Sequence, residues 1–453
     1  MTASANLIST PLSLPCGKIL PNRLVKAAMT EWLADPADNL PNEKHCRLYA
    51  EWARGGAGTL ITGNVLVDRR YLESPYNVAA EAVDLDDPER LALFKQWATA
   101  IRKHNAVSIV QLGHAGRQSP RSVTSEPVSP SAVKINLPGG AGGVFKKPRA
   151  MTEAEIEDVI ERYVVAARLC KEAGFDGVQI HSAHGYLLSS WLSPLVNMRT
   201  DKYGGTPEKR RLLLLTIVRR IKQEISGMIL AIKLNSSDFQ KGGFSEQESL
   251  DVIEELKNLN IDFLEISGGT YEVAAMAGVE GEPSSTQVAE PVRKSTRARE
   301  AYFVDFARQV TMRFGSQLPL MVTGGWRSGL TMNAALQQST MQLIGLARPL
   351  CIDPDFAQRL LAMHPSEDVA VVDHKIDAWL PVGQELRKTL MLGLISPFHI
   401  ALMAQIAAGK KPSTNDINLM KLLTVDMVAN MIYSPRRSNP LRTVRQWLGF
   451  ERE

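Results

Sequence analysis

Short apolar runs rich in β-branched residues recur along most of the chain and alternate with amphipathic stretches. The runs are mostly apolar throughout rather than strictly alternating, as is typical of parallel strands buried on both faces. Repeated strand–loop–helix units predict an α/β fold of the (β/α)8 TIM-barrel class. The eight candidate strands are Leu24–Met29, Thr59–Val67, Val107–Leu112, Gly177–Ile180, Ile229–Leu234, Phe263–Ser267, Pro319–Thr323 and Gln342–Leu346.

Helix-boundary residues fall between these runs. Thr152 and Glu155 have the spacing of a capping box, and the helix that they open should end at Gly174. Proline at a helix start marks two further helices, Glu89–His104 after Pro88 and one from Pro207 to about Ile225.

Two segments lie outside the repeated units. Leu12–Leu14 and Lys18–Leu20 flank Cys16-Gly17, and we expect them to form an N-terminal hairpin that plugs the bottom of the barrel. Residues beyond about 364 are extra. We therefore divide the chain into a barrel domain, residues 1–364, and a C-terminal helical extension of unknown role, residues 365–453.

The extension contains a stretch, Thr389–Gly409, without Lys, Arg, Asp or Glu. Its length would allow a membrane span. The break at Ile395-Ser396-Pro397 instead favours two packed helices joined at Ser396-Pro397, so membrane contact through residues 389–409 is the less favoured alternative. Helices around Asn415–Tyr433 should follow, and then a basic segment that we interpret as a solvated face.

Composition excludes several classes of protein. With 453 residues, 44% hydrophobic and 22% charged, the chain can bury a large core. A net charge of +4, without a basic run interleaved with aromatics, gives no indication of nucleic-acid binding. The four cysteines are scattered and predict neither disulfides nor an iron–sulfur cluster. The N-terminus lacks the pattern of a signal peptide, so a cytoplasmic setting is expected.

The stretch Val178–Gly205 carries the clearest chemistry. His181, His184 and Tyr186 follow an apolar strand, and two imidazoles with a phenol can bind an oxyanion and supply a proton. This favours a carbonyl-type substrate. A metal site that combines His114 with the two histidines is an alternative, but a metal site leaves Tyr186 without a role, and we predict no metal.

Other strand ends supply candidate ligands. Gly324, Gly325 and Arg348 follow the last two strands, where TIM barrels often bind phosphate. Lys233 lies inside an apolar strand, so it either forms an ion pair, for example with Glu265, or stands beside a cofactor that becomes negative. Gln111 has the donor and acceptor that suit a pyrimidine edge, or it satisfies backbone groups. The hydroxyl of Thr30 could contact a ring oxygen, and Met29 could simply be a core residue.

Taken in order, several segments resemble the Old Yellow Enzyme family of FMN-dependent NAD(P)H:flavin oxidoreductases over about residues 10–360. They are LPNRLVKAAMT (20–30), GGAGTLITG (55–63), VQLGHAGRQ (110–118), the stretch HSAHGYLLSSWLSPLVNMRTDKYGG (181–205), IKLNSSDFQKGGFS (232–245), ISGGTYE (266–272), TGGWRS (323–328) and IGLARPLCIDPD (344–355).

The resemblance implies a TIM barrel with non-covalent FMN at its C-terminal mouth and NAD(P)H as the electron donor. The resemblance also implies which residues of this chain contact the cofactor. Along the flavin it places Ala27, Ala28, Met29 and Asn64, at the pyrimidine ring Gln111, at N1/O2 Lys233, and at the phosphate Gly324, Gly325, Ala347 and Arg348. For the substrate it implies that His181 and His184 bind the carbonyl and that Tyr186 is the proton donor.

The chain departs from the family at three positions. Lys233 replaces the usual arginine, which keeps the charge but loses bidentate bonding. Thr30 replaces a cysteine that one branch carries at the flavin edge, so redox tuning by a thiol is not expected. Trp32 replaces a frequent tyrosine. The extension also lacks the cysteines and the dinucleotide fingerprint of long relatives that resemble 2,4-dienoyl-CoA reductase.

The expected reaction is ping-pong hydride transfer from NAD(P)H through FMN to the C=C bond of an α,β-unsaturated carbonyl compound. A flavin barrel that works oxidatively, as a dehydrogenase or demethylase, is the first alternative, and a metal hydrolase is the second. A non-catalytic binding module is the third. The choice between NADH and NADPH and the formation of a homo-oligomer stay open.

Overall fold

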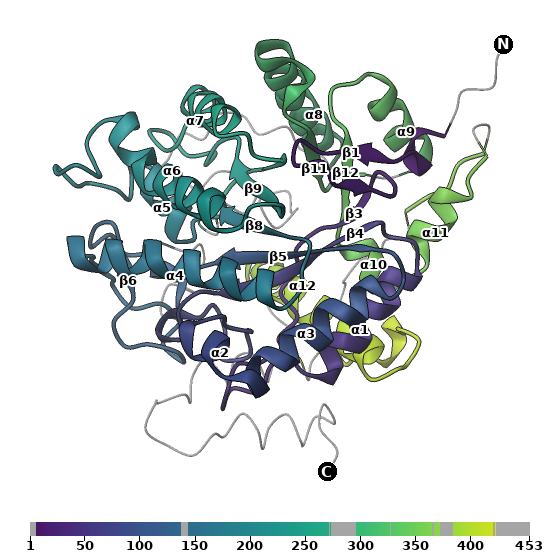
Figure 1. The fold of residues 1–453 in the computed structure, drawn as a ribbon, viewed down its shortest axis with the longest axis horizontal. Coiled ribbons are helices and arrows are strands. Elements are labelled where there is room, and N and C mark those ends of the chain that lie inside the picture. The colour runs from purple at the N-terminus through teal and green to yellow at the C-terminus, as the bar shows by residue number, and fades with distance from the viewer. Residues whose placement is uncertain are drawn as a thin grey trace.

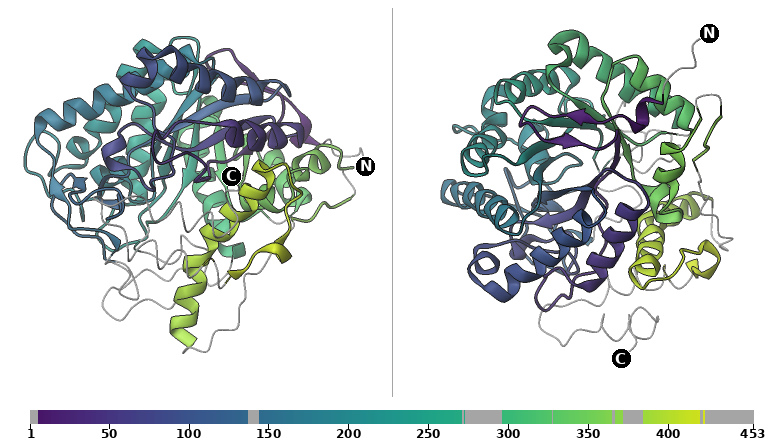
Figure 2. Two further views of the ribbon diagram at one scale, coloured as in Figure 1. Left: turned by 90° about the horizontal axis from the view of Figure 1, so that it is seen from below. Right: turned by 45° about the vertical axis from the view of Figure 1, so that its right-hand side comes forward.

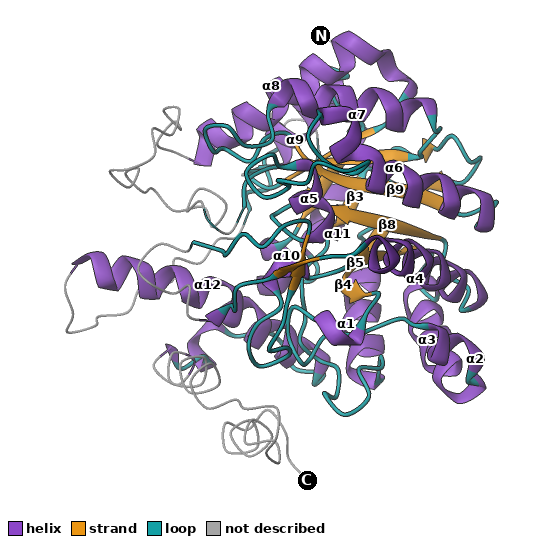
Figure 3. Ribbon diagram, turned by 90° about the vertical axis from the view of Figure 1, so that its left-hand side faces the viewer, coloured by secondary structure: helices purple, strands orange, loops and turns teal. Residues whose placement is uncertain are grey.

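The computed structural model describes residues 6–136, 144–270, 272, 296–326, 328–364, 367–371, 384–419 and 422. Eight parallel strands close into a barrel, and helices surround it (Figure 1, Figure 3). The TIM-barrel prediction is confirmed. In barrel order the strands are β3 (Leu24–Lys26), β4 (Thr59–Leu66), β5 (Val107–Gly113), β8 (Gly177–Ser182), β9 (Ile229–Asn235), β10 (Phe263–Ser267), β11 (Leu320–Thr323) and β12 (Leu343–Leu346).

All eight predicted strands are present, and most boundaries agree within two residues. Every residue of β4, β8 and β9 is buried, because the barrel interior covers one face of these strands and the helices cover the other. The difference is β3, which ends at Lys26 rather than Met29. Ala27 still donates its N–H to the carbonyl of Leu346, and the chain then leaves the barrel wall as a loop at the mouth.

Helices connect successive strands and form the outer layer. The helix opened by Thr152 and Glu155 has both capping-box bonds and ends before Gly174, as predicted. The helices are α1 (Glu43–Arg54), α2 (Ala82–Asp86), α3 (Pro88–Arg102), α4 (Glu153–Glu172), α5 (Leu187–Leu192), α6 (Pro207–Glu224), α7 (Glu246–Asn258), α8 (Thr296–Phe314), α9 (Gly329–Gln337), α10 (Arg348–Ile352), α11 (Phe356–Leu361) and α12 (Gln384–Ala407).

The N-terminal hairpin is present as β1 (Leu12–Ser13) paired antiparallel with β2 (Ile19–Leu20). Leu14 and Leu20 are buried in a cluster with first residues of the barrel strands, such as Ile229 and Phe263. The hairpin therefore closes the N-terminal end of the barrel, as predicted, and leaves the other end for chemistry.

The helical extension differs from its prediction. Ser396-Pro397 does not separate two helices, because α12 runs through Pro397 without a break. A proline inside a helix removes one hydrogen bond, and burial of Phe398 and Leu402 in the main core stabilises the continuous helix. Figure 2 shows α12 beside α1, which it contacts.

Most of the predicted segment Asn415–Tyr433 and all of the basic segment lie outside the described residues. In the part of the chain that the structure describes, no helix combines the length and the apolar character needed to cross a membrane.

Candidate active site

Parallel pairing brings the predicted site residues to one end of the barrel. Asn64 pairs with Gln111, His181 pairs with Lys233, and Thr323 pairs with Gly345. Side chains that come from distant parts of the sequence therefore meet at the C-terminal mouth. The mouth includes Ala27, Ala28, Met29 and Thr30 after β3, His184 and Tyr186 after β8, Gly324 and Gly325 after β11, and Ala347 and Arg348 after β12.

The predicted histidine–tyrosine cluster is assembled. The ring of His181 lies 5.2 Å from that of His184 and 4.9 Å from that of Tyr186, measured between centroids, with edge-to-face orientations. His181 and Tyr186 are buried at 4% and 5% exposure, so a ligand that reaches them is largely shielded from water. Tyr186 occupies the N-cap position of α5, and its carbonyl accepts the N–H of Ser190 at 2.8 Å, which holds its backbone in place.

His181 is built to donate a hydrogen bond as a neutral ring. Its Nδ1 accepts the N–H of Ala183 at 3.3 Å, which leaves the proton of a neutral imidazole on Nε2. Burial, with further contributions from His184 and Lys233, holds the pKa of His181 well below its usual value. His181 therefore carries an N–H donor without a charge at neutral pH.

His184 has a strained backbone that its neighbours enforce. Its φ is +63°, which is uncommon for a residue with a side chain. Asn235 accepts its N–H at 3.3 Å, and Gln118 donates to its carbonyl at 2.8 Å. The ring nitrogen Nε2 lies 2.6 Å from the hydroxyl of Ser267. Strain that is held by several contacts is a common property of functional sites, and it was not visible in the sequence.

A buried polar network crosses the barrel below this cluster. Lys233 forms an ion pair with Glu265 at 2.9 Å, so the ion-pair alternative for Lys233 is present in the structure. Glu265 also accepts bonds from Thr323 and Gln179, each at 2.8 Å. Gln179 in turn accepts a bond from Gln111 at 2.7 Å. Sequence reasoning missed Gln179, although it lies two positions before His181 and so faces the same side of β8.

These residues fit the ring of FMN. Lys233 supplies a cation that is only 6% exposed, and Gln111 supplies an amide. Asn64 lies beside Gln111, and its buried Oδ1 has no hydrogen-bond partner among the described residues. A buried orphan acceptor at this position is suited to an N–H donor of a ligand.

The glycines that we predicted at a phosphate have the backbone conformation that glycine favours. Gly324 and Gly325 have φ values of +90° and +87°, a left-handed conformation in succession that favours glycine. Thr323 pairs with Gly345, so both glycines lie beside Ala347 at the end of β12. The side chain of Arg348 is exposed there. Backbone N–H groups and a guanidinium are the donors that a phosphate requires.

Thr30 has a hydrogen-bonding arrangement that the sequence did not reveal. Its hydroxyl donates to Glu73 at 3.0 Å and accepts from Asn77 at 3.3 Å. While that donation holds, Thr30 cannot also donate to a flavin oxygen. Burial raises the pKa of Glu73.

A second buried network supports the loop that carries Thr30. The ammonium of Lys26 is fully buried and donates to Tyr49 at 3.0 Å. Tyr49 donates to Glu31, which also accepts the N–H of Gly63 at 2.9 Å. Burial lowers the pKa of Lys26 to about 8. The loop is thus anchored at both ends, by Lys26 and by Glu31, and the residues between them are presented at the mouth.

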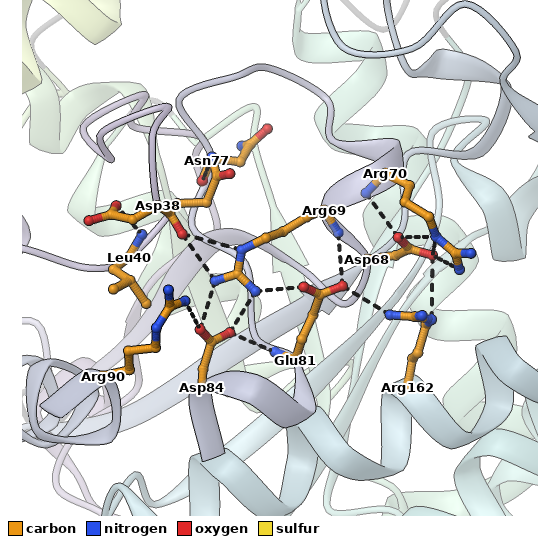
Figure 4. A network of polar contacts seen from close by, with 11 residues as sticks. Asp38, Leu40, Asp68, Arg69, Arg70, Asn77, Glu81, Asp84, Arg90 and Arg162 are labelled. Carbon is orange, nitrogen blue, oxygen red and sulfur yellow. Dashed lines mark hydrogen bonds and ion pairs between the residues drawn. The ribbon is translucent and has the colours of Figure 1, made fainter. Parts of the chain in front are cut away.

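The loop after β4 is held by the ion-pair network of Figure 4. Arg69 bonds both oxygens of buried Asp84, at 2.7 and 2.8 Å, and also bonds Glu81 at 2.6 Å. Arg162 of α4 joins Glu81 at 2.9 Å. This network fixes the start of the loop that carries Glu73.

The metal alternative finds no support in the geometry. Nδ1 of His114 accepts the N–H of Gly116, and its ring stacks on Tyr71 at 5.2 Å. Burial lowers the pKa of His114 to about 4. Across the described residues, no group of three or more His, Cys, Asp or Glu side chains could hold a metal ion.

Comparisons with known proteins identify the family of the chain. The family model of the NADH:flavin oxidoreductase / NADH oxidase family matches residues 8–367. An NADH-dependent flavin oxidoreductase of Hypocrea jecorina is 36% identical over 389 residues, which cover 82% of this chain and 94% of that protein. An NADH oxidase of Thermoanaerobacter brockii is 30% identical over 75% of this chain, which spans only 48% of that longer protein.

Solved structures agree on the fold. The old yellow enzyme homologue from Zymomonas mobilis gives a TM-score of 0.63 at 25% identity, over 78% of this chain and 92% of that one. A 2-naphthoyl-CoA reductase gives a TM-score of 0.69 at 22% identity, over 81% of this chain and 54% of that one. The chain therefore belongs to the NADH:flavin oxidoreductase / NADH oxidase family, the Old Yellow Enzyme family, which uses FMN with NAD(P)H as the electron donor.

Proposed function

We propose that this flavin oxidoreductase is an ene-reductase, which reduces the activated C=C bond of an α,β-unsaturated carbonyl compound. The observation that carries the proposal is the packing of His181, His184 and Tyr186 against one another at the barrel mouth. Enone reduction needs donors that stabilise charge on the carbonyl oxygen and an acid that protonates the α-carbon. The cluster provides both kinds of group.

Bound FMN would supply the redox chemistry, by accepting hydride from NAD(P)H and transferring it to the β-carbon of the acceptor. Lys233 and Gln111 would hold the ring, and Gly324, Gly325 and Arg348 would hold the phosphate. The carbonyl oxygen would accept a hydrogen bond from Nε2 of His181, which stays neutral because the pKa of His181 is lowered by burial. His184 would be the second donor.

Tyr186 would deliver the proton. A phenol ordinarily titrates near pH 10, so it keeps its proton at neutral pH and can act as a general acid. The buried setting of Tyr186 excludes most water, so the proton that reaches the α-carbon would come from the phenol. The hydroxyl would then be restored from solvent after the product leaves.

The test compares the two half-reactions of Tyr186→Phe by rapid mixing. Reduction by NADH should be unchanged, whereas anaerobic re-oxidation by 2-cyclohexenone should slow by about 10²–10⁴-fold, the usual contribution of a general acid. Tyr163→Phe is the matched control, because it removes a buried phenol hydroxyl on α4, away from the mouth. An unchanged rate of enone reduction in Tyr186→Phe would remove Tyr186 from the role.

A further inference from the structure

Glu265 occupies the centre of the buried network, and none of the site roles above uses it. Its side chain has no exposed surface. One oxygen, Oε1, accepts from Lys233 on β9 and from Thr323 on β11, and the other, Oε2, accepts from Gln179 on β8. A buried carboxylate needs such donors, and three other strands of the barrel supply them: β9 and β11, which flank β10, and β8, which lies beyond β9.

An ionised carboxylate only accepts hydrogen bonds, and this fixes the orientation of two amides. Gln179 must turn its NH₂ group toward Glu265 at 2.8 Å, so its carbonyl oxygen faces Gln111. Gln111 must therefore donate from its own NH₂ group to Gln179 at 2.7 Å. The carbonyl oxygen of Gln111 is consequently left as the acceptor for another group.

Glu265 also changes the charge that Lys233 presents. The two groups are 2.9 Å apart and both are shielded from water, where charges interact more strongly than in solvent. A negative charge that develops beside Lys233 therefore meets an ion pair instead of an unpaired cation. The attraction is weaker than Lys233 alone would provide.

We propose that Glu265 is the positioning residue of the cofactor site: it holds Lys233, makes Gln111 an acceptor for the N3–H group of the flavin, and makes reduction of bound FMN less favourable by offsetting the charge of Lys233. The proposal rests on the proposed function, because it takes Lys233 and Gln111 as contacts of the flavin. It concerns this chain in particular, since Lys233 stands where the resemblance led us to expect arginine.

The test uses Glu265→Gln in the FMN-loaded protein. Its reduction potential, measured by equilibration with a reference dye, should be more positive than that of the unsubstituted protein. Apoprotein should also be titrated with FMN and with 3-methyl-FMN, which lacks the N3–H donor. The preference for FMN should fall by roughly two- to tenfold, the value of one hydrogen bond. Asp262→Asn is the matched control, because Asp262 is a buried carboxylate beside the opposite end of β10.

Either an unchanged potential or an unchanged preference for FMN in Glu265→Gln would overturn the proposal. If Glu265→Gln does not fold, Gln179→Met provides the test. It removes the amide that links Glu265 to Gln111 and keeps the ion pair between Lys233 and Glu265. Its preference for FMN should fall while its potential stays constant, and an unchanged preference would overturn the proposal. If the unsubstituted protein does not bind FMN, the proposed function fails instead, so the two failures are distinguishable.

Discussion

Replacing Asn235 with alanine should weaken binding of a carbonyl or phenol ligand without removing any group that contacts it. Asn235 is buried, and its amide accepts the N–H of His184 at 3.3 Å and donates to the carbonyl of Gly269 at 3.0 Å and to Asp238 at 3.3 Å. The loss of these three bonds should destabilise the protein by about 3 kcal/mol, at about 1 kcal/mol each.

The effect on the site follows from the backbone of His184. A left-handed conformation costs about 1–2 kcal/mol for a residue with a side chain, and the side chains of Asn235 and Gln118 both hold the backbone of His184 in it. Without Asn235, ligand binding has to restore part of that strain. Because Gln118 remains, we expect the lower part of the range, a loss of affinity of about 5- to 10-fold.

The assay is titration with a substituted phenol, followed by its charge-transfer band. Asn22→Ala is the control, because Asn22 also makes three hydrogen bonds in a buried setting but lies at the opposite end of the barrel. It should lose similar stability and bind the phenol normally. Equal phenol affinities for Asn235→Ala and Asn22→Ala would refute the role of the His184 conformation.

Three further predictions concern stability, measured by urea unfolding. The pKa of Glu73 is raised in the folded state, so ionisation of Glu73 destabilises the fold as pH rises. The free energy of unfolding of Glu73→Gln, relative to that of the unsubstituted protein, should therefore increase from about pH 4 to pH 7. A difference that does not change with pH would contradict this. Asp84→Ala should cost about 3–5 kcal/mol, because it removes the buried carboxylate that pairs with Arg69 and Arg90. Glu254→Gln, on an exposed ion pair, should cost below about 1 kcal/mol, and similar losses for the two variants would be the contrary result. Leu402→Ala on α12 should cost about 2–5 kcal/mol within a single unfolding transition, and a separate early transition would show that α12 is not part of the barrel core.

The barrel was predictable because strands buried on both faces leave continuous apolar runs, and the hairpin because two short runs flank Cys16-Gly17. Positions at the mouth were predictable because all parallel strands end on the same side, which brought Gln111, Lys233 and His181 together. Only the closure of the barrel determines that Glu265 meets Gln179 from β8, a strand that is not its neighbour.

The hydrogen bond of Thr30 and the continuity of α12 could not be predicted from the sequence, because both depend on contacts between distant segments. The bond from Thr30 to Glu73 joins two loops that are 43 positions apart, and loop paths are not encoded in local periodicity. The continuity of α12 through Pro397 depends on packing against α1, which outweighs the local preference of proline to end a helix.

The most direct measurement is anaerobic mixing of the NADH-reduced protein with 2-cyclohexenone, with absorbance and product analysis. The account predicts that the yellow colour returns without oxygen and that about one equivalent of cyclohexanone forms per FMN. A protein that binds FMN and is bleached by NADH, but stays bleached with the enone until oxygen is admitted, would contradict it.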